Sequence, residues 1–379
     1  MALRLKTDWI LFTTVVLLVF FGAVMIYSAS SVKAEQKFGS SYYYIGRQMF
    51  FLVIGLVVMM ILKHTSYRKL QHAGIAFAVL GLVVMLLVGV YFADPQYHRW
   101  IRMGFVGLQP SEFAKPGLTL FLAYFIALRS RAINSRYTLL PAAVAVGLIT
   151  VAVVVADLGT AVVLYLTAVV MFFVAGMDRR YIMITVGIAL LGALCAVIAK
   201  PYRLARVVQY FDPQYKLVDK IDPGGRIKVY LKRSLVAKDT GYQGEQSKIA
   251  VGSGGIQGLG LMEGKQKLLY LPEPHTDFIY AVVGEEFGLI GATLVLIGFL
   301  VIFWRGIRAA VLVPDEFGRY LALGITVALG IQALMNMSVV LGMGPTKGIP
   351  LPMISYGGTS LLSTLASIGV LLNVSEHAG

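Results

Sequence analysis

The stretch WILFTTVVLLVFFGAVMIY (residues 9–27) determines the class of fold, because it carries no charge and is long enough to cross a bilayer. The hydrocarbon core of a membrane requires about 20 predominantly apolar residues per helix. Arg4 and Lys6 precede the stretch, as in a secretory signal, and residues 28–30 resemble a cleavage site. The apolar run is longer than a signal-peptide core, so we interpret it as a retained transmembrane helix.

Comparable apolar runs recur along the whole chain. Of the 379 residues, 58% are hydrophobic and only 14% are charged, and the mean hydropathy is +0.78. A soluble domain carries far more charge on its surface. We therefore predict an all-α, polytopic membrane protein in which residues 1–379 form a single domain of about ten transmembrane helices. The predicted helices are residues 9–28, 45–63, 73–92, 112–128, 138–156, 158–176, 182–199, 277–304, 319–342 and 353–373.

The distribution of Lys and Arg predicts the orientation of these helices. Cytoplasmic loops of membrane proteins are enriched in basic residues. If the N-terminus is cytoplasmic, the short loops on the inner side carry more Lys and Arg than those on the outer side. We therefore predict an inner-membrane protein with both termini in the cytoplasm. Residues 201–276, between the seventh and eighth helices, then form a large extracytoplasmic loop, because long loops cross the membrane regardless of their charge.

This large loop has two halves of different composition. Residues 203–233 mix Val, Leu, Ile and Tyr with Arg and Lys, which is typical of helices that lie on a membrane surface. Residues 252–260 (GSGGIQGLG) contain too much glycine for a stable helix. Their backbone N–H groups could cradle a phosphate, but the composition favours a flexible linker.

The charge and cysteine content restrict the classes of partner. The formal net charge is +14, which in a soluble protein would point to nucleic acid. In a membrane protein it favours anionic lipid head groups or an anionic lipid-linked substrate, and we predict no nucleic-acid partner. Cys195 is the single cysteine, so the chain forms no internal disulfide and has no cysteine-based metal site.

Charged residues at membrane depth are energetically costly and often functional, and the first such cluster is Glu112 with Lys115. The two residues follow Pro110 and Ser111, which predict the start of the fourth helix. A spacing of three residues places both side chains on one helix face, where they can pair. A structural role for this pair is favoured over a functional one, because a buried ion pair can fix the position of one helix within a bundle.

The second cluster comprises His275, Asp277, Glu285 and Glu286. Asp277 lies where the large loop meets the eighth predicted helix, so it could simply cap that helix. Glu285 follows eight residues later, on roughly the same helical face and about 12 Å deeper. Because capping does not require three carboxylates, a general base at the water boundary is an equally good interpretation.

The third cluster is a proline-rich loop before the last helix, PTKGIPLP (345–352) followed by SYGG (355–358). It could be a re-entrant hairpin, or a lip that shapes a substrate site with Lys347 close to an anion. Elsewhere, Trp100 follows His98 and Arg99, and most simply is an interfacial aromatic anchor.

Four long motifs in the chain resemble the SEDS family of membrane glycosyltransferases, whose types include RodA and FtsW. The motifs are HRWIRMGFVGLQPSEFAK (98–115), GYQGEQSKIAVGSGGIQGLGL (241–261), KQKLLYLPEPHTDFIYAVVGEEFG (265–288) and NMSVVLGMGPTKGIPLPMISYGGTS (336–360). The resemblance extends over nearly the whole chain. It implies ten helices with cytoplasmic termini, as predicted above, and polymerisation of lipid II into peptidoglycan strands.

The resemblance also implies roles for particular residues. The family's essential aspartate corresponds to Asp277, and Trp100, Glu112 and Lys115 occupy further important positions. The Pro-Thr-Lys-Gly sequence at residues 345–348 resembles the division type, FtsW. Members of the family act with a class B penicillin-binding protein, a transpeptidase with a single membrane span.

The family chemistry implies inversion at the donor sugar, with Asp277 as the base. A cationic environment would hold the leaving pyrophosphate, with or without a divalent cation such as Mg²⁺ or Mn²⁺. The candidate cations are Arg203, Arg206, Lys232, Arg233 and Lys347. Two alternatives remain open at this point: a lipid II flippase, and a non-catalytic scaffold that activates the penicillin-binding protein.

Overall fold

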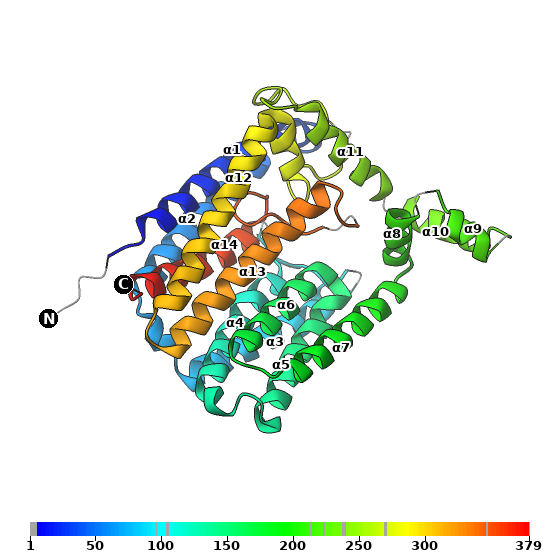
Figure 1. Ribbon diagram of the computed structural model, residues 1–379. Helices are drawn as coiled ribbons and strands as arrows, with labels where there is room; N and C mark the ends of the chain where they lie inside the picture. The colour runs from blue at the N-terminus through cyan, green and yellow to red at the C-terminus, as the bar shows by residue number, and fades with distance from the viewer. Residues whose placement is uncertain are drawn as a thin grey trace.

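In the computed structural model, the residues described are 6–95, 97–103, 106–212, 214–222, 224–236, 240–268, 271–345 and 348–378. Within them, one long helix occupies each of the ten predicted positions, which confirms the all-α polytopic fold (Figure 1). These helices are α1 (Trp9–Phe38), α2 (Tyr43–His64), α3 (Ala73–Ala93), α4 (Pro110–Arg129), α5 (Arg136–Ala156), α6 (Leu158–Val174), α7 (Arg179–Ile198), α12 (Ile279–Leu312), α13 (Glu316–Val340) and α14 (Gly358–Glu376).

Eight of the ten are long and apolar enough to cross a membrane by length and composition alone. The other two are α6, which has only 17 residues, and α4, which carries Glu112 and Lys115 in its first turns. The helices alternate in direction, so both termini lie at one end of the bundle. We call this the terminal end, and the other the distal end.

Local chemistry explains where several helices begin and end. α1 continues ten residues beyond its predicted end and stops at Gly39, whose φ of 67° favours glycine. Residues 28–30 therefore lie inside a helix and are buried. Between α5 and α6, the Asp157 side chain accepts hydrogen bonds from the backbone N–H groups of Gly159 and Thr160, which allows an immediate reversal of the chain.

The core of the bundle forms around α4, α13 and α14. Helix α13 packs against α4, α6 and α12, and α14 packs against α2. By contrast, α7 buries none of its residues and contacts mainly α6 and α8 (Pro201–Phe211). A short hairpin of β1 (Ile101–Met103) and β2 (Val106–Leu108) precedes α4, with Ile101 paired to Leu108. It is the one departure from an all-helical chain among the described residues.

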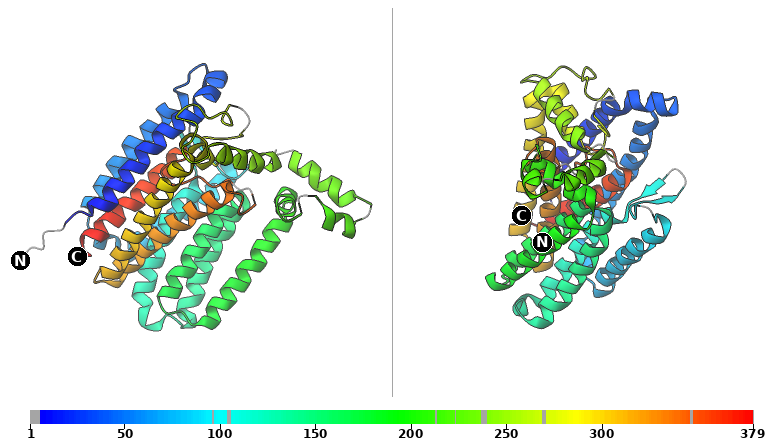
Figure 2. Two further views of the ribbon diagram at one scale, coloured as in Figure 1. Left: turned by 45° about the horizontal axis from the view of Figure 1, so that its top comes forward. Right: turned by 90° about the vertical axis from the view of Figure 1, so that its right-hand side faces the viewer.

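The large loop between α7 and α12 is mostly helical. After α8 come α9 (Lys216–Ile221), α10 (Arg226–Val236) and α11 (Thr240–Ser253). Helices α8, α9 and α10 form an arm that projects from the distal end of the bundle (Figures 1 and 2). The arm has a small core of its own, made by Ala205, Tyr215, Val218 and Leu231. The first half of the loop is thus helical, as predicted, while the position of these helices on a membrane surface stays a prediction.

The prediction of a flexible glycine linker at residues 252–260 is wrong. α12 breaks at Gly288, whose φ of 63° and ψ of −159° are not helical. Residues 254–260, which we call the glycine wedge, dock against this break. The N–H groups of residues 259 and 260 donate to the carbonyl oxygens of residues 285 and 286, each at 3.0 Å, and residue 289 donates to residue 255 at 2.9 Å.

The glycines of this wedge allow two backbones to approach closely. A Cβ atom on Gly254 would lie 2.0 Å from the carbonyl oxygen of Gly284, and one on Gly258 would lie 2.2 Å from that of Glu286. Side chains at these positions would separate the two segments. The wedge also uses its N–H groups for α12, which argues against the phosphate cradle considered above.

Candidate active site

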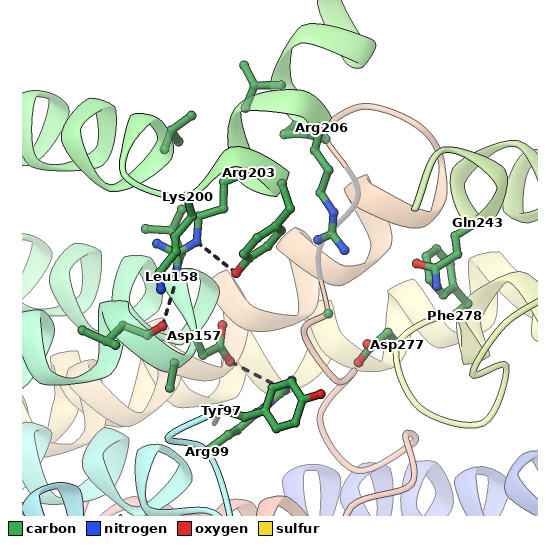
Figure 3. Close-up of a pocket in the computed structure, with 17 residues that line it drawn as sticks. Tyr97, Arg99, Asp157, Leu158, Lys200, Arg203, Arg206, Gln243, Asp277 and Phe278 are labelled. Atoms are coloured by element: carbon green, nitrogen blue, oxygen red, sulfur yellow. Dashed lines mark hydrogen bonds and ion pairs between the residues drawn. The ribbon is translucent and has the colours of Figure 1, made fainter. Parts of the chain in front are cut away.

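A cavity of about 480 Å³ opens at the distal end of the bundle, between the ends of α5, α6 and α7, helix α8 and the loop before α12 (Figure 3). The charged residues that line it come from four separate segments. They are Arg99, Asp157, Lys200, Arg203, Arg206 and Asp277. Four cations thus face two carboxylates, a balance that suits an anionic ligand.

Asp277 lies in the loop immediately before α12 and faces the cavity. It does not cap this helix, because the N-cap residue is Phe278 and no side-chain cap bond forms. The Asn336 amide of α13 donates a hydrogen bond of 2.8 Å to the backbone oxygen of Asp277. The carboxylate packs on Gly348, where an added Cβ would lie only 2.5 Å from its Oδ2 atom.

The surroundings of Asp277 adjust its acidity. Burial raises the pKa of this carboxyl group to about 6; the positive charge of Arg99 opposes the increase, and the negative charge of Asp157 adds to it. A carboxyl group with a pKa near neutrality is largely deprotonated at physiological pH, and its carboxylate is still basic enough to accept a proton effectively. The pKa of Asp277 is therefore compatible with the predicted role as a general base.

Backbone groups at the ends of two helices hold part of the cationic lining of the cavity in place. The Arg203 guanidinium donates to the carbonyl oxygens of Val154 and Ala196, at 2.7 and 3.1 Å, and so connects the ends of α5 and α7. Arg206 follows one turn later on α8 and also lines the cavity. Both predicted cations are thus at the site, and Arg203 has a structural role as well.

The remaining predicted cations cannot be placed. Lys347 lies outside the described residues, and so do the side chains of Lys232 and Arg233. The segment after Lys347 is well held: Asn336 donates to the backbone oxygen of Ile349 at 2.7 Å as well as to that of Asp277. This one amide therefore joins the proline-rich loop to the candidate base.

Glu112 and Lys115 are buried beside this loop and outside the cavity. Lys115 Nζ lies 2.8 Å from Glu112 Oε2 and 2.6 Å from the amide oxygen of Gln332. The amide nitrogen of Gln332 in turn donates to the backbone oxygen of Pro350 at 2.9 Å. The arrangement agrees with the structural interpretation of the pair, which supports the loop that packs on Asp277.

Glu285 and Glu286 do not face the cavity. Glu285 accepts hydrogen bonds from the backbone N–H groups of residues 265 and 266, at 2.7 and 3.0 Å. Glu286 forms a buried ion pair of 2.5 Å with Lys267 and accepts a hydrogen bond from Ser28. The expected alignment with Asp277 fails because Asp277 precedes the helix, so helical periodicity does not relate it to residue 285.

His275 and Trp100 do not line the cavity. His275 is buried between Tyr44 and Tyr356, and burial lowers the pKa of its imidazole to about 4. It is therefore neutral at physiological pH. Trp100 precedes the β-hairpin with its ring against Gly107, whereas its neighbour Arg99 lines the cavity.

The sequence analysis missed Arg99, Asp157 and Lys200 as site residues. Asp157 Oδ2 lies 3.9 Å from the Arg99 guanidinium, so the two join the walls of the cavity. A single acid between two apolar runs was a usable signal for Asp157. The divalent cation stays a prediction: of the two carboxylates that line the cavity, Asp157 is already engaged by backbone N–H groups.

The helical bundle and the cavity together define a polytopic membrane protein with a cation-lined cavity and one carboxylate of raised pKa at its distal end. The chain belongs to the FtsW, RodA and SpoVE family, because the family model described as "Cell cycle protein" matches residues 8–379. The resemblance to the SEDS family is thereby confirmed.

Individual relatives match over almost their full length. The chain is 40% identical to the "Probable peptidoglycan glycosyltransferase FtsW" of Geobacter sp. (strain M18), over 98% of this chain and 97% of that one. It is 38% identical to "Stage V sporulation protein E" of Bacillus subtilis (strain 168), over 99% and 98%.

Solved structures share the fold. The rod shape determining protein RodA of Thermus thermophilus matches with a TM-score of 0.68 and 25% identity over 99% of each chain. A chain in the structure described as "Structural coordination of polymerization and crosslinking by a peptidoglycan synthase complex" matches with a TM-score of 0.74 and 26% identity over 98% of each chain.

Proposed function

We propose that the chain is a peptidoglycan glycosyltransferase that polymerises lipid II into glycan strands, with Asp277 as its general base. The observation that carries the proposal is the position of the Asp277 carboxylate, which faces a cavity lined by four cations. The names of the relatives support the reaction class. The raised pKa of Asp277 supports its role.

The proposed step is an inverting displacement. Asp277 takes the proton from the 4-hydroxyl group of the acceptor sugar as the hydroxyl oxygen attacks C1 of the donor sugar. The bond between C1 and the diphosphate oxygen breaks on the opposite side, and the diphosphate leaves with the bonding electrons. Arg99, Arg203 and Arg206 line the cavity and would stabilise the negative charge on this leaving group. An α-linked donor thereby gives a β-1,4 bond.

We place this reaction at the outer face of the bacterial inner membrane, with both termini in the cytoplasm. The excess of Lys and Arg in the loops at the terminal end supports this orientation. We further propose a class B penicillin-binding protein as the partner, since one similar chain belongs to a "peptidoglycan synthase complex". The Pro-Thr-Lys-Gly sequence at residues 345–348 favours a role in division over elongation.

The test is strand formation from lipid II by the purified protein in detergent, with Asp277→Asn compared with wild type. We expect the variant to be folded and inactive, because an amide cannot serve as the base. Asp178→Asn is the matched control, since Asp178 is exposed at the terminal end before α7. A detergent micelle does not separate two compartments between which lipid could be moved. A flippase would therefore form no strands in this assay.

Adding the transpeptidase separates the remaining alternatives. Wild-type activity that appears only with the transpeptidase, and is lost in Asp277→Asn, would indicate a polymerase that requires activation. Full activity of the complex with Asp277→Asn would instead leave only a scaffold role. Absence of strands under every condition would refute the polymerase proposal.

A further inference from the structure

A second cavity lies at the terminal end of the bundle, far from Asp277. It has a volume of about 160 Å³ and is bounded by the segment before α1, the last turns of α12 and the end of α14. The segment before α1 and the end of α14 meet in this region, where Thr7 donates a hydrogen bond to Glu376. Its charged lining residues are Lys6, Asp8, Arg305 and Arg308.

The interior of this cavity is fixed by a buried ion pair. Asp8 caps α1 by accepting a hydrogen bond from the N–H group of Leu11, and it binds the Nε and Nη2 atoms of Arg305 at 2.8 and 2.7 Å. These two charges neutralise each other and hold Arg305 in place. The remaining charges of the lining, on Lys6 and Arg308, are both positive and exposed.

The nearest acid on α14 does not cancel this excess. Glu376 is buried and lies 2.9 Å from Lys63 Nζ, and the Thr7 hydroxyl donates to the same carboxylate at 2.9 Å. The negative charge of Glu376 is therefore neutralised by the lysine of α2. The cavity consequently presents two positive charges above a neutral, rigid floor.

Exposed tryptophans place this cavity at the membrane interface. Trp9 is 66% exposed at the start of α1, and Trp304 is 57% exposed beside Arg305, whose guanidinium lies 5.5 Å from the indole centroid. Exposed tryptophans of membrane proteins gather at the level of the lipid head groups. Small anions at that level are mainly the phosphates of lipids, and basic pockets between helix ends recognise them.

We propose that this cavity binds the phosphate of an anionic phospholipid head group, with Lys6 and Arg308 as its ligands. The inference does not depend on the glycosyltransferase proposal. Its chemistry requires only a phosphate anion, so lipid and soluble phosphate must be distinguished by experiment.

The test compares the full-length wild type with the double variant Lys6→Gln/Arg308→Gln in lipid nanodiscs. Retention of phosphatidylglycerol against phosphatidylcholine is measured by native mass spectrometry. We expect the double variant to bind phosphatidylglycerol on the order of tenfold more weakly. The control Arg179→Gln/Arg180→Gln removes the same charge at the same end, from exposed positions outside this cavity. It should bind normally, as should Lys6→Arg/Arg308→Lys.

A parallel titration with inorganic phosphate in lipid-free detergent distinguishes the source. Binding that depends on Lys6 and Arg308 only in nanodiscs supports the lipid head group. Equal dependence in both settings supports the anion site and assigns it to soluble phosphate as well. The proposal would be overturned if the double variant and the control pair lost phosphatidylglycerol binding equally, or if neither of them lost any.

Discussion

Replacing Gly348 by alanine would put a methyl group where the Asp277 carboxylate now lies. The added Cβ would be 2.5 Å from Oδ2 and 3.3 Å from Cγ, whereas ordinary contacts begin at 3.4 Å. One of the two groups must therefore move by about 0.9 Å. A displacement of this size at a catalytic group costs on the order of 100-fold in rate. We expect the rate of strand formation to fall by about that factor.

The assay is strand formation from lipid II by the purified variant, with thermal unfolding measured in parallel to verify folding. Gly344→Ala is the matched control in the same loop, because no heavy atom lies within 4 Å of its added Cβ. The control should retain the wild-type rate. A folded Gly348→Ala protein with a rate within about threefold of wild type would refute the reasoning, since the predicted loss is on the order of 100-fold.

Asn336→Leu removes the side-chain amide that donates to the backbone oxygens of Asp277 and Ile349. We therefore expect a lower Tm and a roughly tenfold slower rate of strand formation. An unchanged rate would contradict this expectation. Activity should disappear as the pH falls through about 6, where Asp277 becomes protonated. Asp157→Asn removes a negative charge that raises this pKa, so the acidic limb of the pH–rate profile should move to lower pH. Lys267→Met and Glu286→Gln should each lower the free energy of unfolding by about 3–5 kcal/mol, because each leaves one buried charge unpaired. Their combination should cost less than the sum, and additive losses in a double-mutant cycle would argue against coupling.

The arrangement of helices was predictable because a bilayer imposes a length and an apolar composition on every span. Even α6, which is short, was found from its apolar run between Asp157 and residue 176. This inference depends on local composition, which the sequence contains directly. For Asp277, the position at the boundary between a long loop and a helix left a helix cap and a general base equally possible, and only the resemblance to the SEDS family favoured the base.

The grouping of the acids was not predictable in this way. The sequence predicts one helix that contains Asp277, Glu285 and Glu286, whereas α12 begins only after Asp277. The two glutamates instead bind residues 265–267, a segment that precedes α12 in the chain. Arg99 reaches the cavity from the loop before the β-hairpin, far from Asp277 in sequence. Such contacts depend on tertiary packing, which periodicity along one helix does not encode.

The break in α12 has a consequence for the biogenesis of the protein. Gly288 lies roughly 13 Å along α12, and the helix cannot itself supply the backbone hydrogen bonds that are missing at its break. The glycine wedge supplies those bonds, and it precedes α12 in the chain, so a ribosome makes the partner before the helix that needs it. Deleting residues 254–260 would leave several backbone groups at the break without partners, each at a cost of about 1–3 kcal/mol where it stays buried. Such a deletion should therefore impair the folding of α12 itself, before any catalytic defect could be observed.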